Sequence, residues 1–178
     1  MTPDELKALV RTVPDFPSPG IQFRDITTLI GHGEGMSHAV RYLAGHARGA
    51  GADAIAGMEA RGFIFGAAVS VALAKGFVPV RKPGKLPVET LGIDYALEYG
   101  TDRLEIDPGA ITEGQNIVIV DDLLATGGTA LATVELLRQA GATVATACFV
   151  IDLPDLGGAR RLNEAGVNVI SLMEFEGD

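Results

Sequence analysis

The sequence has no tryptophan and a single cysteine, Cys148, among its 178 residues. One cysteine excludes a disulfide within the chain and favours a reducing compartment, so we expect a cytoplasmic location. Basic residues are also scarce: 14 Lys and Arg stand against 23 Asp and Glu, and the formal net charge is −9. This balance argues against a general nucleic-acid-binding protein and a polybasic membrane anchor, but it leaves room for a small anionic substrate bound by local charge.

The chain also lacks long apolar stretches. No run approaches the roughly 20 residues that span a bilayer, so no membrane segment is expected. Residues 1–5 contain no basic stretch before an apolar core, so we expect no signal peptide. Hydrophobic residues make up 47% and charged residues 21% of the sequence, which is typical of a globular protein and excludes a disordered one. The length fits one domain, residues 1–178.

Short apolar runs alternate with segments of helical spacing along most of the chain. The expected helices cover residues 2–10, 35–50, 63–75, 129–140 and 156–165. The expected strands cover residues 53–58, 77–80, 116–120, 143–151 and 168–172. Two Pro- and Gly-containing segments, 14–25 and 81–94, are expected to be loops, the second of them mobile, and 95–99 with 103–106 an extended pair. This order predicts an α/β fold: an open, mostly parallel twisted sheet flanked by helices on both faces.

Ligands of open α/β sheets bind beyond the carboxyl ends of the strands. The most informative segment there is 118–129, Val-Ile-Val-Asp-Asp-Leu-Leu-Ala-Thr-Gly-Gly-Thr. Gly127 and Gly128 allow backbone N–H groups to approach an anion, and the following helix N-terminus adds partial positive charge. Thr126 and Thr129 supply hydroxyl donors, so the segment predicts a phosphate site.

Two carboxylates precede that phosphate loop. Asp121 and Asp122 could accept hydrogen bonds from sugar hydroxyls or hold a hydrated Mg²⁺. The alternative is that they are ordinary helix caps beside an ordinary turn. The segment lacks the Gly-Lys-Ser/Thr of a Walker loop and the Gly-x-Gly-x-x-Gly of dinucleotide-binding folds.

Residues 118–129 closely resemble the 5-phosphoribosyl-1-pyrophosphate (PRPP) binding motif of the type I phosphoribosyltransferases. Within that family, residues 16–26, Phe-Pro-Ser-Pro-Gly-Ile-Gln-Phe-Arg-Asp-Ile, resemble the base-binding segment of the adenine phosphoribosyltransferases. Glu-Ala-Arg-Gly-Phe at 59–63 resembles their pyrophosphate loop, and residues 81–87 and 97–100 resemble the start and end of their flexible loop. The match runs in register from about residue 14 to the C-terminus.

The resemblance implies the type I phosphoribosyltransferase fold with an N-terminal hood at 1–30 and a flexible loop and hairpin at 81–106. It implies a homodimeric, Mg²⁺-dependent pentosyltransferase of purine salvage that converts adenine and PRPP to AMP and pyrophosphate. The Mg²⁺ would be held mainly by PRPP and water. The implied site residues are Ala125, Thr126, Gly127, Gly128 and Thr129 for the 5′-phosphate; Asp121 and Asp122 for the ribose and Mg²⁺; Arg61, Arg81, Lys82 and Lys85 for pyrophosphate; Gln22, Phe23, Arg24 and Leu153 for adenine; and Glu98 as the catalytic residue, acting on a purine nitrogen.

Two features of the sequence bear on substrate choice. Ala125 stands where hypoxanthine and guanine enzymes usually carry Asp, which disfavours a 6-oxopurine, although xanthine enzymes can also lack that Asp. A phosphoribosyltransferase for another base therefore stays open, as does a PRPP-sensing regulator, which would usually need a nucleic-acid-binding surface. Glu59 and Ala60 stand where many relatives have Asp-Ser, a change that could alter pyrophosphate contacts.

Other candidates have ordinary structural explanations. Arg61 and Glu98 could be exposed surface residues, and the basic residues of the 81–85 segment could belong to a solvated loop. His32, His38 and His46 show no metal-ligand spacing, and Cys148 lies in an apolar strand where packing is the simpler role.

Overall fold

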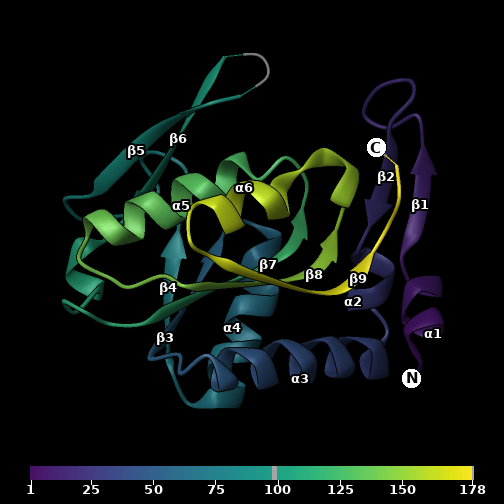
Figure 1. Ribbon diagram of the computed structural model, residues 1–178, viewed down its shortest axis with the longest axis horizontal. Coiled ribbons are helices and arrows are strands. Elements are labelled where there is room, and N and C mark those ends of the chain that lie inside the picture. The colour runs from purple at the N-terminus through teal and green to yellow at the C-terminus, as the bar shows by residue number, and fades with distance from the viewer. Residues whose placement is uncertain (98–99, 178) are drawn as a thin grey trace.

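The computed structural model describes residues 1–97 and 100–177. Five parallel strands form the main sheet in the order β4-β3-β7-β8-β9 (Figure 1). Their bounds are β3 Ala54–Met58, β4 Gly76–Val80, β7 Ile117–Leu124, β8 Thr146–Asp152 and β9 Asn168–Glu174. The helices are α1 Pro3–Ala8, α2 Thr27–Ile30, α3 Gly33–Gly49, α4 Arg61–Leu73, α5 Gly128–Gln139 and α6 Gly158–Glu164, with short 3-10 turns at Pro108–Ala110 and Pro154–Leu156. The predicted α/β fold is confirmed.

The central strand β7 shows why the sheet is covered on both faces. Its side chains alternate, so that Ile117 and Ile119 pack in the core beneath α5 and α6, whereas Val118 and Val120 pack against α3 and α4. All four side chains are fully buried. A continuous apolar strand of this kind requires helices on each side, which is the arrangement in Figure 1.

The structure corrects the expected end of β7. The strand was expected to stop at Val120, before the two acids, but its ladder with β8 continues through Asp121 to Leu124. Asp121 and Asp122 therefore lie within the strand, and their side chains are fixed by the sheet. The start of the next strand is also later than expected, because Thr143 makes only an isolated bridge to Asn116 and β8 begins at Thr146.

Two antiparallel hairpins lie outside the main sheet, at opposite sides of it (Figure 1). β1 (Arg11–Pro14) pairs with β2 (Gln22–Asp25), so the expected loop at 14–25 is wrong at both ends. β5 (Leu91–Ala96) pairs with β6 (Thr101–Ile106), so the expected mobile loop ends earlier than residue 94 and the extended pair begins earlier than residue 95. Leu91 and Ile93 pack on the core beneath α5, which explains the extra strand residues. No helix in the described part of the chain is long and apolar enough to cross a membrane.

Candidate active site

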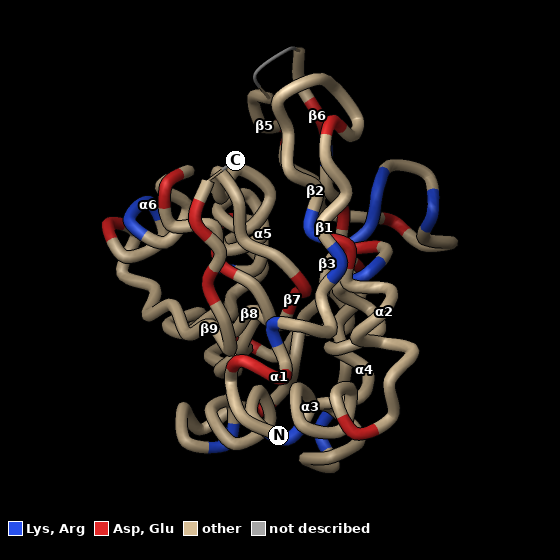
Figure 2. Tube along the Cα trace, turned by 90° about the vertical axis from the view of Figure 1, so that its right-hand side faces the viewer, with Lys and Arg blue, Asp and Glu red and all other residues tan. Residues whose placement is uncertain are grey.

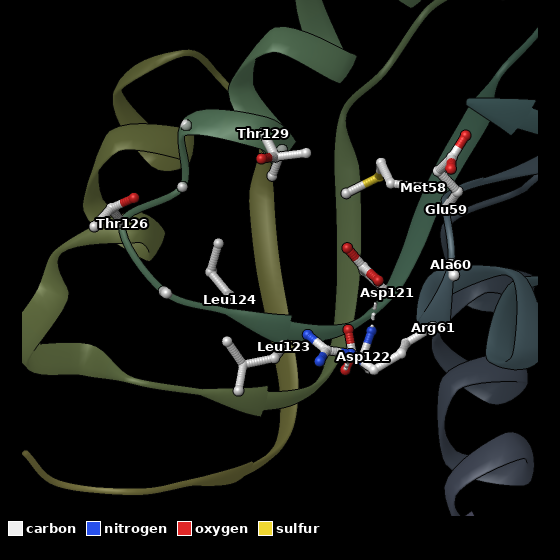
Figure 3. A pocket seen from close by; sticks show the side chains of 14 residues that line it. Met58, Glu59, Ala60, Arg61, Asp121, Asp122, Leu123, Leu124, Thr126 and Thr129 are labelled. Atoms are coloured by element: carbon white, nitrogen blue, oxygen red, sulfur yellow. Dashed lines mark hydrogen bonds and ion pairs between the residues drawn. The ribbon is translucent and has the colours of Figure 1, made fainter. Parts of the chain in front are cut away.

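A polar cavity of about 430 Å³ opens at the carboxyl ends of β3 and β7. Figure 3 shows Thr126 and Thr129 on one side of it and Asp121, Glu59 and Arg61 on the other. The lining residues are Met58, Glu59, Ala60, Arg61 and residues 121–130. The structure thus brings together Arg61, the two acids and the whole predicted phosphate loop.

The loop between β7 and α5 exposes the N-terminus of that helix to the cavity. Among the described residues no side chain caps α5, whose N-cap is Gly127 with φ +83°. A Cβ at Gly127 would lie 2.9 Å from the Cα atom of Gly158, so both the backbone angle and the packing require glycine there. Uncapped N–H groups at a helix N-terminus are suited to bind an anion such as phosphate.

The two acids beside this loop differ in their surroundings. Asp122 is buried and forms an ion pair with Arg61, with 2.6 Å between Nε and the carboxylate. The backbone N–H of Asp122 donates to Oδ1 of Asp121 over 2.8 Å. Desolvation, followed by the neighbouring charge of Asp122, raises the pKa of Asp121 well above its ordinary value. The ionised form of Asp121 is therefore disfavoured, and a cation or a hydroxyl-bearing ligand beside it would stabilise that form.

The helix that follows β3 comes unusually close to Asp121. A Cβ at Gly62, in the first turn of α4, would lie 2.5 Å from Oδ1 of Asp121. Sequence reasoning missed Gly62, although a glycine directly after Arg61 in a strand-to-helix turn is a recognisable signal of close approach.

The other predicted pyrophosphate residues, Arg81, Lys82 and Lys85, do not line this cavity, and the first two are engaged with acidic side chains. Glu59 accepts a hydrogen bond from the backbone N–H of Lys82 over 2.7 Å and pairs with Arg81 at 3.3 Å. The Lys82 ammonium forms an ion pair with Asp102 of β6, and the Arg81 guanidinium also donates to the Lys85 carbonyl over 3.3 Å. Figure 2 shows that acidic residues are spread over many elements, while basic residues form fewer, separate groups.

A second series of contacts joins the β5–β6 hairpin to the predicted phosphate loop. The hydroxyl group of Tyr95 in β5 lies 3.2 Å from the carboxylate of Asp102 and 3.3 Å from the hydroxyl of Thr129. The hydrogen bond from Lys82 lowers the pKa of Asp102, so this carboxylate is ionised at neutral pH. Sequence reasoning missed Tyr95 and Asp102, because a strand pattern does not reveal which loop the strand will face.

An apolar cavity of about 390 Å³ adjoins the polar one. Arg61, Leu123, Ala125 and Thr126 line both. The remaining lining residues are Ile21, Gln22, Phe23, Arg24, Leu153 and Leu156, so all four predicted adenine-binding residues lie here. Ile21, Leu123 and Leu156 were missed, since an isolated apolar residue near a strand end looks like ordinary core.

Within this cavity the aromatic side chain is held by its neighbours. The ring of Phe23 packs edge-to-face with Phe16, with 5.2 Å between centroids, and the Arg61 guanidinium lies 5.9 Å from the Phe23 ring centre. The Arg24 guanidinium is turned away, and it donates to the hydroxyl of Thr12 over 2.7 Å. The predicted catalytic residue Glu98 lies outside the described residues.

A polar cavity at an uncapped helix N-terminus thus adjoins an apolar cavity, and the comparisons with known proteins identify the family to which this pair belongs. The phosphoribosyl transferase domain family matches residues 30–170. The chain is 71% identical to the adenine phosphoribosyltransferase of Erythrobacter litoralis and 72% identical to that of Novosphingobium aromaticivorans, each alignment covering 99% of both chains. The chain therefore belongs to the phosphoribosyltransferase family and, within it, to the adenine phosphoribosyltransferases.

Solved structures give the same assignment. The adenine phosphoribosyltransferase of Thermoanaerobacter pseudethanolicus is 48% identical and superimposes with a TM-score of 0.93, covering 98% of this chain and 100% of that one. The enzyme from Saccharomyces cerevisiae, complexed with an imino-altritol bisphosphate and adenine, is 40% identical with a TM-score of 0.90, covering 96% and 98%. The type I phosphoribosyltransferase fold expected from the sequence is confirmed, and the chain is a pentosyltransferase.

Proposed function

We propose that this enzyme transfers the 5-phosphoribosyl group of PRPP to N9 of adenine, releasing pyrophosphate and forming AMP for purine salvage. The observation that carries the proposal is the pair of adjoining cavities, one polar and one apolar, which share Arg61, Ala125 and Thr126. A ligand with a phosphate at one end and a flat base at the other matches this pair in chemistry and order. Residues 1–178 act as one phosphoribosyltransferase domain, with residues 1–30 as the hood over the base and 81–106 as the flexible loop and hairpin.

On the phosphoribosyl side, the backbone N–H groups of residues 125–129 and the hydroxyls of Thr126 and Thr129 bind the 5′-phosphate. The exposed N-terminus of α5 supports this role. Asp121 and Asp122 accept hydrogen bonds from the ribose hydroxyls. These bonds offset the desolvation and the neighbouring charge of Asp122 that together raise the pKa of Asp121.

Pyrophosphate binding requires the basic residues to exchange partners. Arg61 leaves Asp122 for the ligand, and Arg81 and Lys82 leave the carboxylates that hold them in the free enzyme. Lys85, on the same segment, adds a fourth cation. Arg supplies paired donors to phosphate oxygens, whereas Lys acts as a point charge.

The chemistry places positive charge on the ribose while the bond to pyrophosphate breaks. The residues stabilise this separation with fixed charges and N–H donors in a site from which loop closure excludes water. Adenine lies between Phe23 and Leu153, beside the backbone of Gln22 and Arg24, so that N9 faces the ribose. Glu98 accepts a hydrogen bond from a purine nitrogen and takes up the proton that the base loses.

The donor set also fits a Mg²⁺ ion held largely by the substrate. Asp121 and Asp122 line the polar cavity and would hold the hydrated ion there, and no cluster of three or more metal-ligating side chains occurs among residues 1–97 and 100–177. When bound, Mg²⁺ neutralises charge on the pyrophosphate and so makes it a better leaving group.

The enzyme is proposed to act as a cytoplasmic homodimer. Helix α4 supports a second copy as the partner because it carries apolar residues on its outer face: Ile64 is 40% and Val71 82% exposed. Light scattering at micromolar concentration should give about twice the 18.5 kDa of one chain. A mass near that of one chain would contradict the dimer.

The test of the function is incubation with PRPP, Mg²⁺ and each purine base in turn, with nucleotide formation followed by chromatography. We expect AMP from adenine and little product from hypoxanthine, guanine or xanthine. Faster turnover of xanthine than of adenine would show that the enzyme is a phosphoribosyltransferase for another base. Binding of PRPP without turnover of any base, together with a gel shift of nucleic acid, would favour a regulator.

A further inference from the structure

The segment that follows β9 lies against the outside of the apolar cavity. After Glu174 the chain runs beside β2, as Figure 1 shows at the C-terminal label. The Phe175 N–H donates to the Asp152 carbonyl over 3.0 Å, and the Gly177 N–H donates to the Asp155 carboxylate over 2.8 Å. The Arg24 guanidinium donates to the Glu176 carbonyl over 3.1 Å. Residues 175–177, which we name the C-terminal brace, therefore touch two separate parts of the molecule.

The ring of Phe175 is the centre of the contact with the hood. The Arg24 guanidinium carbon lies 4.8 Å from the ring centroid, and the Lys7 ammonium of α1 lies 5.1 Å from it. Nε of Arg24 is buried and has no hydrogen-bond partner among the described residues. The face of the Phe175 ring is therefore an important compensation for burying that part of the charge.

The two parts that the brace joins are the two walls of the apolar cavity. Arg24 directly follows Gln22 and Phe23 in β2, which line one wall. Asp155 lies in the 3-10 turn between Leu153 and Leu156, which line the other. Phe175 itself is not among the residues that line the cavity.

We infer that Phe175 is a positioning residue for adenine, which acts through Arg24 to fix the hood wall against the Leu153–Leu156 wall. The inference rests on the proposed assignment of the apolar cavity to the base. β1 and β2 pair only with each other in the described sheets, so the hood depends on side-chain contacts for its position. Loosening these contacts makes the two walls less well organised for a flat base and leaves the sheet-borne phosphate loop unchanged.

Steady-state kinetics of Phe175→Leu test this division. Leucine retains apolar volume but removes the ring face, and a cation–ring contact of about 0.5–2 kcal/mol corresponds to an increase of about two- to thirtyfold in the KM for adenine. The KM for PRPP should stay within about twofold. Phe175→Tyr, which keeps the ring, should restore the wild-type KM. Lys7→Ala is the matched control, because it removes the other cation on this ring without changing a cavity wall. The KM for adenine should therefore stay at the wild-type value in Lys7→Ala.

The contrary results are equally specific. An unchanged adenine KM in Phe175→Leu, or equal rises in the adenine and PRPP KM values, would overturn the positioning role. Asp155→Ala, which removes the acceptor for Gly177, should raise the adenine KM in the same direction and provides the test if Phe175→Leu does not fold.

Hydrogen exchange separates this inference from the proposed function. The amides of residues 22–24 should exchange faster in Phe175→Leu than in wild type, whatever base the enzyme uses. If the wild-type enzyme forms no AMP but these amides still exchange faster in Phe175→Leu, the proposed function is wrong and the role of Phe175 in holding the hood wall stands. If the wild-type enzyme forms AMP but amide exchange is the same in Phe175→Leu as in wild type, only the role of Phe175 is rejected.

Discussion

The two cavities of the site are constructed in different ways. The polar cavity, the proposed phosphoribosyl side, is formed by residues at the ends of β3 and β7 and at the start of α5, all continuous with the buried core of the sheet. The apolar cavity, the proposed base side, shares part of that lining, but its other walls come from the β1–β2 hairpin and from the turn after β8. The walls of the polar cavity are therefore fixed by the fold itself, whereas part of the apolar cavity depends on contacts that can change without disturbing the sheet.

The strongest way to break the phosphoribosyl side is to remove both of its carboxylate charges. Asp121→Asn combined with Asp122→Asn should lower kcat/KM at least about 100-fold, because the ribose and Mg²⁺ lose their charged partners. The fold should persist, since asparagine has nearly the same size. Circular dichroism with adenine-to-AMP kinetics checks both parts, and wild-type kinetics in the double variant would refute the role of these acids.

A backbone change should distinguish the two sides by binding. Gly127→Val places a β-branched side chain at φ +83°, where a Cβ would already crowd Gly158. PRPP affinity measured by calorimetry should fall at least about tenfold, because the loop amides can no longer surround a phosphate. Adenine affinity should fall less.

Gly114→Val is the control for that experiment. Gly114 also has a positive φ of +76°, but a Cβ there would meet no atom within 4 Å, and the residue lies outside both cavities. It should lose stability without a selective loss of PRPP binding. PRPP bound as tightly by Gly127→Val as by wild type would show that the phosphate loop is misassigned.

A change on the base side should affect adenine and not PRPP, and its effect should be smaller. Phe23→Ala removes the aromatic face of the hood wall, so the KM for adenine should rise about fivefold. The PRPP KM should stay near the wild-type value, because Phe23 does not line the polar cavity. A larger effect on PRPP than on adenine would mean that the two cavities are not divided as described.

The smallest expected effect concerns stability and pH. Desolvation raises the pKa of Asp121 above its ordinary value of 3.8, so wild type loses stability as the pH rises from about 4 through the folded-state pKa. Asp121→Asn removes this loss. Its Tm should exceed that of wild type at pH 7, and by less near pH 4.

The pKa of Asp25, an acid in the hood, is shifted in the opposite direction to that of Asp121. Hydrogen bonds from Thr27, with the help of Arg11, lower the pKa of Asp25 to about 2. Its ionised form therefore stabilises the fold above about pH 4, and this stabilisation is lost as the pH falls towards 2. Asp25→Asn should lower the Tm at pH 7 and match wild type near pH 2. Equal Tm changes in both variants would contradict the contrast.

Much of this arrangement could be predicted from the sequence. The parallel sheet follows from apolar runs such as 116–120, and the turn between β7 and α5 follows from two glycines between a strand and a helix. Gly127 has a φ of +83°, a backbone conformation in which glycine is strongly preferred, so the residue type fits its place in the turn. These features are local, so their residues are adjacent in the chain.

What could not be predicted depends on contacts between distant segments. Polar and Pro-containing segments concealed β1, β2 and the first half of β5, because hairpin pairing overrides a loop-like composition. The same limit applies to the engagement of Lys82 by Asp102, to Tyr95 beside Thr129, and to Phe175 against Arg24. Each of these pairs joins residues that carry no mutual signal in the sequence.

The division of the site into a phosphate-binding and a base-binding cavity is tested most directly by a crystal structure of the enzyme with AMP. We expect one AMP molecule across both cavities, with its phosphate on the N–H groups of residues 125–129 and its adenine between Phe23 and Leu153. An AMP whose base lies away from the apolar cavity, or whose phosphate contacts Arg81 and Lys82 in place of the α5 N-terminus, would contradict it.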